Sequence, residues 1–155
     1  ENALKYINYN LKDKRIFIIG AGGVVPSIIK ALRRLGASNI FLSNRTKKKA
    51  EFLKNIYPDI KIIDWGKIID FDMIINATSL GLKKNDKIKL DLSKAGPNKL
   101  FYDVIYNPAK TNFLKEGERL GNKIANGKMM FIYQARSAFN IWHNVLPEAD
   151  DSLLN

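Results

Sequence analysis

Three glycines at the end of an apolar run are the residues of this chain best suited to hold a ligand. The run 16–19 predicts a buried strand, and Gly20, Gly22 and Gly23 follow it directly before a segment with helical spacing. A strand that turns sharply into a helix directs backbone N–H groups and the positive end of the helix dipole at one point, which suits a diphosphate. Gly20 lets the chain turn, and Gly22 and Gly23 remove side chains where a phosphate would approach. A strand-to-helix turn that holds no ligand fits the same residues.

Basic and polar side chains follow the next apolar run, about 20 residues further on, where dinucleotide-binding folds contact the adenosine ribose. Residues 39–43 predict a second strand, and Asn44, Arg45, Thr46 and a run of lysines that ends at Lys49 come after it. NAD-binding versions of such a fold place a carboxylate here, which would repel a 2′-phosphate. This chain offers an amide, a guanidinium, a hydroxyl and ammonium groups, which can bind phosphate through charge-assisted hydrogen bonds. The residues therefore predict NADP rather than NAD, and the alternative is a solvated, basic start of a helix.

Small polar residues follow a later apolar run. Residues 72–76 predict a strand, and the segment from Asn76 to Ser79 would let the backbone approach a ribose and would supply hydrogen-bond donors. An ordinary capping turn fits the same segment. Asp103, at another predicted strand end, is expected to be a structural acceptor rather than a base, because one carboxylate makes no acid–base pair.

Met130 and Gln134 lie four positions apart in a predicted helix, and so on one face, a turn apart. A thioether can pack on a nicotinamide face while an amide one turn away binds a substrate hydroxyl or carboxylate. A core methionine with a surface glutamine is the alternative. A separate stripe at helical spacing is predicted to face the core, and it consists of Phe131, Ala135, Ala138, Trp142 and Val145.

Alternating strands and helices must position these groups. The alternation predicts an α/β fold, a doubly wound, Rossmann-like parallel sheet of about six strands with helices on both faces. The expected strand order is 3-2-1-4-5-6, with the ligand at the carboxyl ends of the strands. The predicted strands are 14–19, 39–43, 61–63, 72–76, 100–104 and 123–125, the predicted helices are 24–35, 47–57, 111–120 and 128–144, and 82–98 is a predicted loop. Residues 1–155 read as a single domain in which 1–13 form a helical tail and linker and 128–155 the C-terminal helix and tail.

Composition excludes several other classes of protein. The 155 residues suffice for one α/β domain, and no apolar run is long enough to cross a bilayer, so we expect no membrane partner. The net charge is +11, but the lysines are scattered and do not interleave with aromatic residues, so we expect no nucleic-acid partner. The chain has no Cys and a single His, His143, which is predicted to lie on the surface, so we expect no metal site and a cytoplasmic protein.

Five motifs stand in one order along nearly the whole chain. They are Gly20-Ala-Gly-Gly23, Asn44-Arg45-Thr46, Asn76-Ala77-Thr78-Ser79-x-Gly81, Asp103-x-x-Tyr106-x-Pro108-x-x-Thr111 and Gly127-x-x-Met130-x-x-x-Gln134. Together they resemble the shikimate dehydrogenase family. The resemblance implies NADP-dependent reduction of 3-dehydroshikimate to shikimate, a step of aromatic amino-acid (chorismate) biosynthesis.

The resemblance also implies a second domain. Family enzymes carry an N-terminal substrate domain before the cofactor domain, and their catalytic Lys and Asp lie there. The chain begins at Glu1 without Met, so we expect it to be the cofactor domain alone, with no catalytic residue and no activity by itself.

The resemblance further implies a role for each matching residue. The pyrophosphate would bind to Gly20, Ala21, Gly22, Gly23 and Val24, the 2′-phosphate to Asn44, Arg45, Thr46 and Lys49, the ribose beside Asn76, Ala77, Thr78 and Ser79, the nicotinamide beside Val104, Ile105, Gly127 and Met130, and the substrate to Tyr106 and Gln134. Four positions depart from the family pattern. Val25-Pro26 replaces a small residue and Arg, Lys49 stands where Arg is frequent, and Met129 stands where Gly is frequent. At Val25 we expect looser packing of the helix against its strand.

Other functions stay open at this point. The chain could belong to a quinate/shikimate dehydrogenase or another NAD(P)-dependent reductase, or it could be a non-enzymatic nucleotide-binding module. The sequence does not determine the oligomeric state, and a homodimer is one option.

Overall fold

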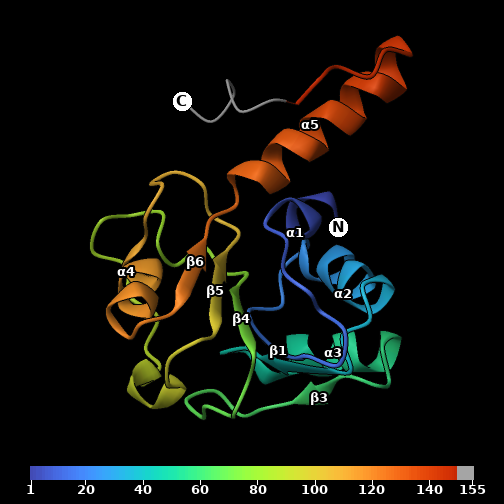
Figure 1. Cartoon of the computed structure of the whole chain (residues 1–155). Helices are drawn as coiled ribbons and strands as arrows, with labels where there is room; N and C mark the ends of the chain where they lie inside the picture. The colour runs from blue at the N-terminus through green and yellow to red at the C-terminus, as the bar shows by residue number, and fades with distance from the viewer. Residues whose placement is uncertain (150–155) are drawn as a thin grey trace.

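Six parallel strands form one sheet within residues 1–149, the part of the chain that the computed structural model describes (Figure 1). The strands are β1 (Arg15–Ile19), β2 (Asn39–Ser43), β3 (Lys61–Ile62), β4 (Met73–Asn76), β5 (Leu100–Asp103) and β6 (Lys123–Ala125). The helices are α1 (Asn2–Tyr6), α2 (Val25–Arg34), α3 (Lys47–Ile56), the 3₁₀ helix η1 (Leu92–Ala95), α4 (Asn112–Arg119) and α5 (Lys128–His143). The strand order is β3-β2-β1-β4-β5-β6, which confirms the predicted Rossmann-like order.

The register of the central strands gathers the predicted site at one edge of the sheet. Ile19 at the end of β1 pairs with Ser43 of β2 and with Asn76 of β4, and Asn76 pairs with Asp103 of β5. All these pairs are parallel, so the chain leaves each strand at the same edge. The turns that follow β1, β2, β4 and β5 therefore meet there.

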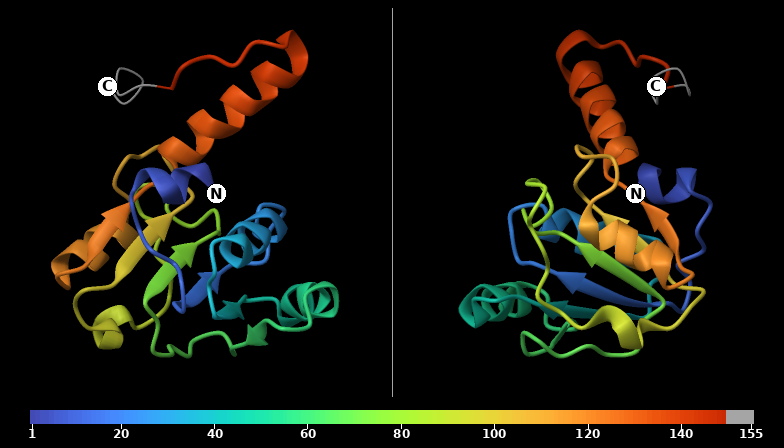
Figure 2. Two further views of the ribbon diagram at one scale, coloured as in Figure 1. Left: turned by 45° about the vertical axis from the view of Figure 1, so that its right-hand side comes forward. Right: turned by 90° about the vertical axis from the view of Figure 1, so that its left-hand side faces the viewer.

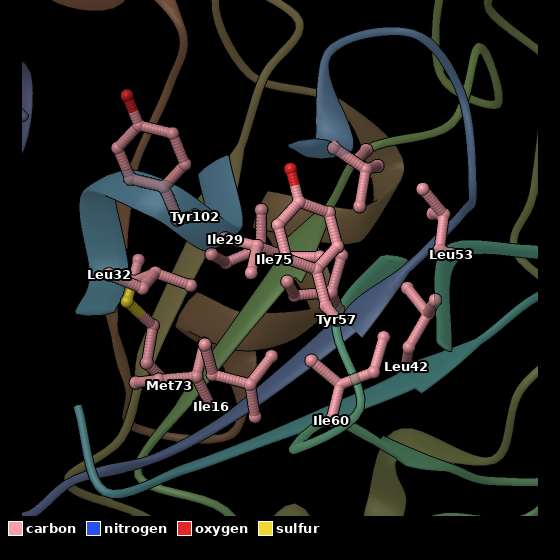
Figure 3. Packing of buried hydrophobic residues seen from close by; sticks show 14 of the residues in the cluster. Ile16, Ile29, Leu32, Leu42, Leu53, Tyr57, Ile60, Met73, Ile75 and Tyr102 are labelled. Atoms are coloured by element: carbon pink, nitrogen blue, oxygen red, sulfur yellow. The ribbon is translucent and has the colours of Figure 1, made fainter. Parts of the chain in front are cut away.

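Strand β1 contributes to the hydrophobic packing on both faces of the sheet because its side chains alternate. Ile16 and Ile18 belong to the cluster beneath α2 and α3, part of which Figure 3 shows. Phe17 and Ile19 belong to the cluster that includes residues of η1 and α4. All four side chains are fully buried, and each stabilises the fold by roughly 1.5–3 kcal/mol relative to an exposed position. The β1 end that carries the glycine turn is thus held firmly from both sides.

The predicted elements agree with the structure to within one residue at each end. The predicted loop 82–98 differs, because it contains η1, where the side chain of Asp91 accepts a hydrogen bond from the amide of Ser93. Val25 is fully buried in the cluster that also contains Ile16 and Ile18 of β1, and looser packing of the helix at this position stays a prediction.

Helix α5 projects away from the sheet, and its beginning lies beside α1 (Figures 1 and 2). Met129 is buried, but Phe131 is 49% exposed and Trp142 is 76% exposed. The predicted core stripe of α5 is therefore wrong, because the helix leaves the sheet and no strand or other helix covers its outer part within residues 1–149. The predicted tail beyond residue 149 lies outside the described residues. No helix within residues 1–149 is long and apolar enough to cross a bilayer.

Candidate functional site

The turn after β1 contains one glycine that the fold itself requires. Gly20 has a φ of +108°, and its amide donates to the carbonyl oxygen of Ser43 at 2.8 Å. A Cβ placed on Gly20 would lie 2.7 Å from the carbonyl oxygen of Ala77, closer than real contacts of this kind. Gly20 therefore allows the ends of β1, β2 and β4 to approach one another.

The fold does not require glycine at the next two glycine positions, 22 and 23. Neither Gly22 nor Gly23 has a left-handed φ, and both are exposed. A Cβ on Gly23 would meet nothing within 4 Å, and one on Gly22 would meet only the carbonyl oxygen of Ala77 at 3.9 Å. The space in front of them is open and suits a phosphate group.

Helix α2 begins at this open space without a side-chain cap. Val24 occupies the N-cap position, where it cannot cap through its side chain, and Pro26 lies in the first turn. Among the hydrogen bonds of residues 1–149, none has the amide of Gly22, Gly23 or Val24 as its donor. These amides and the positive end of the α2 dipole are available to an anion.

The turn between β2 and α3 presents cations beside the glycine turn. The amide of the Asn44 side chain donates to the carbonyl oxygen of Thr46 at 2.8 Å, which closes this turn. Thr46 is the N-cap residue of α3, but its side chain makes no capping hydrogen bond. Arg45 and Lys49 are exposed, and neither takes part in an ion pair within the described part of the chain, whereas Lys47 pairs with Asp64 at 3.8 Å.

A cleft of about 600 Å³ brings most of the predicted cofactor residues together. The predicted residues that line it are Gly20, Ala21, Gly22, Asn44, Arg45, Thr46, Lys49, Ala77, Thr78 and Ser79. Four further residues line the cleft that the sequence interpretation missed, namely Trp65, Leu80, Lys87 and Lys89. Lys87 and Lys89 alternate with the apolar Ile88 and Leu90, a pattern that predicts an extended segment with one basic face but does not place that face at the cleft. No carboxylate is among the described residues that line the cleft.

Asn76 lies behind this cleft rather than in it. Its side chain is fully buried, and its amide donates to Asp103 Oδ1 and to the carbonyl oxygen of Leu80, each at 3.0 Å. Its side-chain oxygen accepts from the amide of Thr78 at 3.1 Å and from the Thr78 hydroxyl at 2.7 Å. Asn76 therefore holds the segment 77–80 in shape, and Ala77, Thr78 and Ser79 face the cleft.

Asp103 is a structural acceptor, as predicted. Its fully buried carboxylate accepts from Asn76, from the amide of Ile105 at 3.0 Å and from the Thr111 hydroxyl at 2.6 Å. Burial raises the pKa of Asp103, and these hydrogen bonds act in the opposite direction. The Thr111 hydroxyl in turn accepts from the amide of Leu114 and caps α4. Asp103 thus ties β5, α4 and the cleft segment after β4 together.

A second hollow, of about 830 Å³, lies where α1, α2 and α5 meet the sheet. Gly23 and Val24 line it together with Met130 and Gln134, so the predicted helix face does turn towards the glycine segment. Tyr106 lines neither hollow, and its ring stacks on Phe131 with centroids 4.8 Å apart.

Three residues predicted to border the nicotinamide line neither hollow, namely Val104, Ile105 and Gly127. The amide of Gly127 donates to the carbonyl oxygen of Ile105 at 3.1 Å. A Cβ on Gly127 would lie only 1.9 Å from the carbonyl oxygen of Val104. The fold therefore requires glycine at position 127, because a side chain there would prevent the start of α5 from passing the end of β5.

Clusters of metal-ligating side chains do not occur in the described part of the chain. Residues 1–149 contain no group of three or more His, Cys, Asp or Glu that could hold a metal ion. His143 lies at the exposed end of α5, as predicted, with its ring against Phe139.

Comparison with known proteins places this geometry in a family. A family model described as Shikimate / quinate 5-dehydrogenase matches residues 1–103. This chain belongs to the shikimate/quinate 5-dehydrogenase family. The shikimate dehydrogenase (NADP(+)) of Pelagibacter ubique (strain HTCC1062) is 54% identical over 153 residues, which cover 99% of this chain and 58% of that protein.

Solved structures of family members share the fold. Shikimate 5-dehydrogenase from Thermus thermophilus, in complex with NADP(H) and shikimate, is 29% identical with a TM-score of 0.83, over 99% of this chain and 57% of that one. Shikimate 5-dehydrogenase from Listeria monocytogenes, in complex with shikimate and NAD, is 26% identical with a TM-score of 0.82, over 94% of this chain and 56% of that one. The chain thus spans little more than half the length of these family members. The fold alone does not select the cofactor, because one of these structures holds NADP(H) and the other holds NAD.

Proposed function

We propose that this chain is the NADP-binding part of a shikimate dehydrogenase, which reduces 3-dehydroshikimate to shikimate. The observation that carries the proposal is the 600 Å³ cleft, which joins the open amides after Gly20 to the unpaired cations after β2. The name of the Pelagibacter relative, shikimate dehydrogenase (NADP(+)), supports the same cofactor and substrate.

The residues of the cleft, together with Gly23 and Val24 beside it, are proposed to contact different parts of the dinucleotide. The amides of Gly22, Gly23 and Val24, at the start of α2, would hold the pyrophosphate. Arg45 and Lys49 would hold the 2′-phosphate through charge-assisted hydrogen bonds, and the planar Arg45 guanidinium can also stack on adenine. The segment 77–79, held by Asn76, would border the ribose. These groups bind and orient the dinucleotide, and they take no part in breaking bonds.

The hollow between α2 and α5 is the proposed place of the reaction. When bound, NADPH supplies the hydride. Met130 would pack on the nicotinamide ring, and Gln134, one helical turn away, would hydrogen-bond a substrate oxygen. Tyr106, Val104, Ile105 and Gly127 remain proposed neighbours of this site on the resemblance to the family.

The groups that transfer the proton are proposed to lie in the part of the enzyme that this chain does not span. The described residues that line the two hollows include no His and no Cys, and the Glu1 carboxylate at the second hollow pairs with Lys5 at 3.1 Å. Lysines and tyrosines also line the hollows, but among the described residues no hydrogen bond or ion pair joins two of them into an acid–base pair.

Cofactor selectivity tests the proposal directly. We expect the purified chain to bind NADP⁺ at least tenfold more tightly than NAD⁺ in isothermal titration calorimetry. Arg45→Ala and Lys49→Ala should each weaken NADP⁺ binding by about tenfold and leave NAD⁺ binding nearly unchanged, because each removes a charge-assisted phosphate contact worth roughly 1.5–3 kcal/mol. Lys47→Ala is the matched control, since Lys47 lies on the same helix but does not line the cleft. Equal losses for both dinucleotides, or a preference of the unchanged chain for NAD⁺, would contradict the assignment.

Turnover gives a second test. We expect the 155-residue chain to bind NADPH but to leave 3-dehydroshikimate unreduced, because the groups that transfer the proton are proposed to lie outside it. The loss of NADPH absorbance measures the rate, and the corresponding full-length protein serves as the positive control. Steady turnover by the chain alone would show that the reacting groups lie within it.

A further inference from the structure

The connection between β4 and β5 sends two lysines into the cofactor cleft. Along 87–90, Ile88 and Leu90 are partly buried and pack against the hydrophobic cluster that contains Phe17. Lys87 and Lys89 alternate with them, are exposed and line the cleft. The apolar neighbours thus anchor this segment and leave the two ammonium groups facing the ligand space.

The backbone just before these lysines is held in place. The Asp86 carboxylate accepts hydrogen bonds from the amides of Gly81 and Lys83 at 3.2 and 3.0 Å. The side-chain amide of Asn112, on α4, donates to the carbonyl oxygens of Lys84 and Asp86, each at 3.0 Å. Hydrogen bonds within the turn and from α4 therefore hold the backbone that precedes Lys87. The lysines need little reordering to contact a ligand.

The charges that line the cleft favour a ligand that carries an additional phosphate group. Arg45 and Lys49 come from the turn after β2, and Lys87 and Lys89 from the connection after β4, so the two pairs reach the cleft from the two sides of β1. None of these four cations takes part in an ion pair with a carboxylate in residues 1–149. A phosphate monoester carries about −1.5 to −2 charges at pH 7, which an unphosphorylated ribose lacks.

We propose that Lys87 and Lys89 form a second cationic arm that strengthens binding of the 2′-phosphorylated dinucleotide and its selection over the unphosphorylated one. This inference rests on the proposed function of the cleft. It extends the selectivity site from the turn after β2 to a segment about 40 residues later, which dinucleotide-binding patterns do not assign.

Two double variants, each of which removes two lysine charges from the connection between β4 and β5, test the second cationic arm. The variant Lys87→Gln with Lys89→Gln removes the two cleft lysines, and the control, Lys83→Gln with Lys84→Gln, removes the same charge from residues that line a different hollow. Calorimetry with NADP⁺, NAD⁺ and adenosine 2′,5′-bisphosphate measures each affinity at two salt concentrations. Circular dichroism checks that all variants fold.

We expect the cleft variant to weaken binding of NADP⁺ and of the bisphosphate by roughly fivefold to tenfold, with a change of less than twofold for NAD⁺. Its NADP⁺ affinity should also depend less on salt, because fewer charges take part. The control should change each affinity by less than twofold. Similar losses in both double variants, or an unchanged ratio of NADP⁺ to NAD⁺ affinity in the cleft variant, would overturn the second arm and leave the proposed function standing. An unchanged chain that does not bind NADP⁺ would overturn both.

Discussion

Replacing Gly22 by Ala is expected to abolish most dinucleotide binding while leaving the fold intact. A Cβ on Gly22 has room, since the nearest atom that it would meet is the carbonyl oxygen of Ala77 at 3.9 Å, and the residue has no left-handed φ. The added methyl group would occupy the space where the backbone must approach the pyrophosphate. We expect the dissociation constant for NADP⁺ to rise at least about 30-fold, which corresponds to about 2 kcal/mol, and the free energy of unfolding to stay equal or rise by up to about 1 kcal/mol.

Gly20→Ala is the matched comparison because it should show the reverse order of effects. Its Cβ would lie 2.7 Å from a backbone oxygen, at a φ of +108°. We expect a loss of about 3 kcal/mol or more in the free energy of unfolding, measured by urea denaturation. If Gly22→Ala destabilises the chain as much as Gly20→Ala, or binds NADP⁺ normally, the two glycines do not have the separate roles that the structure assigns.

Replacing Asp103 by Ala is expected to cost about 3 kcal/mol of stability and to weaken cofactor binding as well. The change leaves the buried Ile105 amide and Thr111 hydroxyl without their acceptor, and it frees one side of Asn76. Since Asn76 holds Thr78, the segment that borders the cleft should become more mobile. Urea denaturation and NADP⁺ titration measure the two effects.

The Asp103→Asn variant separates the hydrogen bonds from the charge. An Asn keeps one acceptor oxygen, and the Thr111 hydroxyl can rotate to accept from the new amide, so we expect a loss of less than about 1 kcal/mol. An Ala variant as stable as the unchanged chain would show that the buried network contributes little.

Stability should also depend on pH through Asp103. Its pKa in the folded chain is raised above the ordinary value of 3.8, chiefly by burial. The folded chain therefore binds this proton more tightly than the unfolded chain, and the contribution of Asp103 to stability falls as pH rises from 3.8 through the raised pKa. Asp103→Asn does not titrate, so it should become more stable relative to the unchanged chain over this pH window. A difference that stays constant or moves the other way would contradict the raised pKa.

Helix α5 shows where interpretation of the sequence went wrong. Its apolar stripe, which includes Phe131 and Trp142, has the spacing of a core-facing helix, and such spacing normally predicts burial. In the structure α5 leaves the sheet after its first turns, so these side chains lie outside the core of the described domain. Helical spacing indicates that a face is apolar, but it does not identify the element that covers it.

The types and spacing of residues close in the sequence were sufficient to predict the fold and most of the residues that line the cleft. Apolar runs that alternate with helical spacing define the strands and helices of a parallel sheet, and the glycines and cations follow strands that are close in the sequence. Lys87 and Lys89 were not predicted, because only the packing of Ile88 and Leu90 on the sheet turns them towards the cleft.

The Rossmann-like order, the glycine turn after β1 and the cations in place of a carboxylate after β2 could all be inferred from the amino-acid sequence. These features depend on residues within one strand–turn–helix unit, where spacing and side-chain chemistry are sufficient. The separate roles of Gly20 and of Gly22 and Gly23 were predicted, but the folded chain was needed to show that the carbonyl oxygen of Ala77 is what requires a glycine at position 20. It was also needed to show that Asn76 lies behind the cleft and that two distant lysines line it. Such distinctions depend on distances between segments that are far apart in the chain, and those distances exist only once the strands have paired.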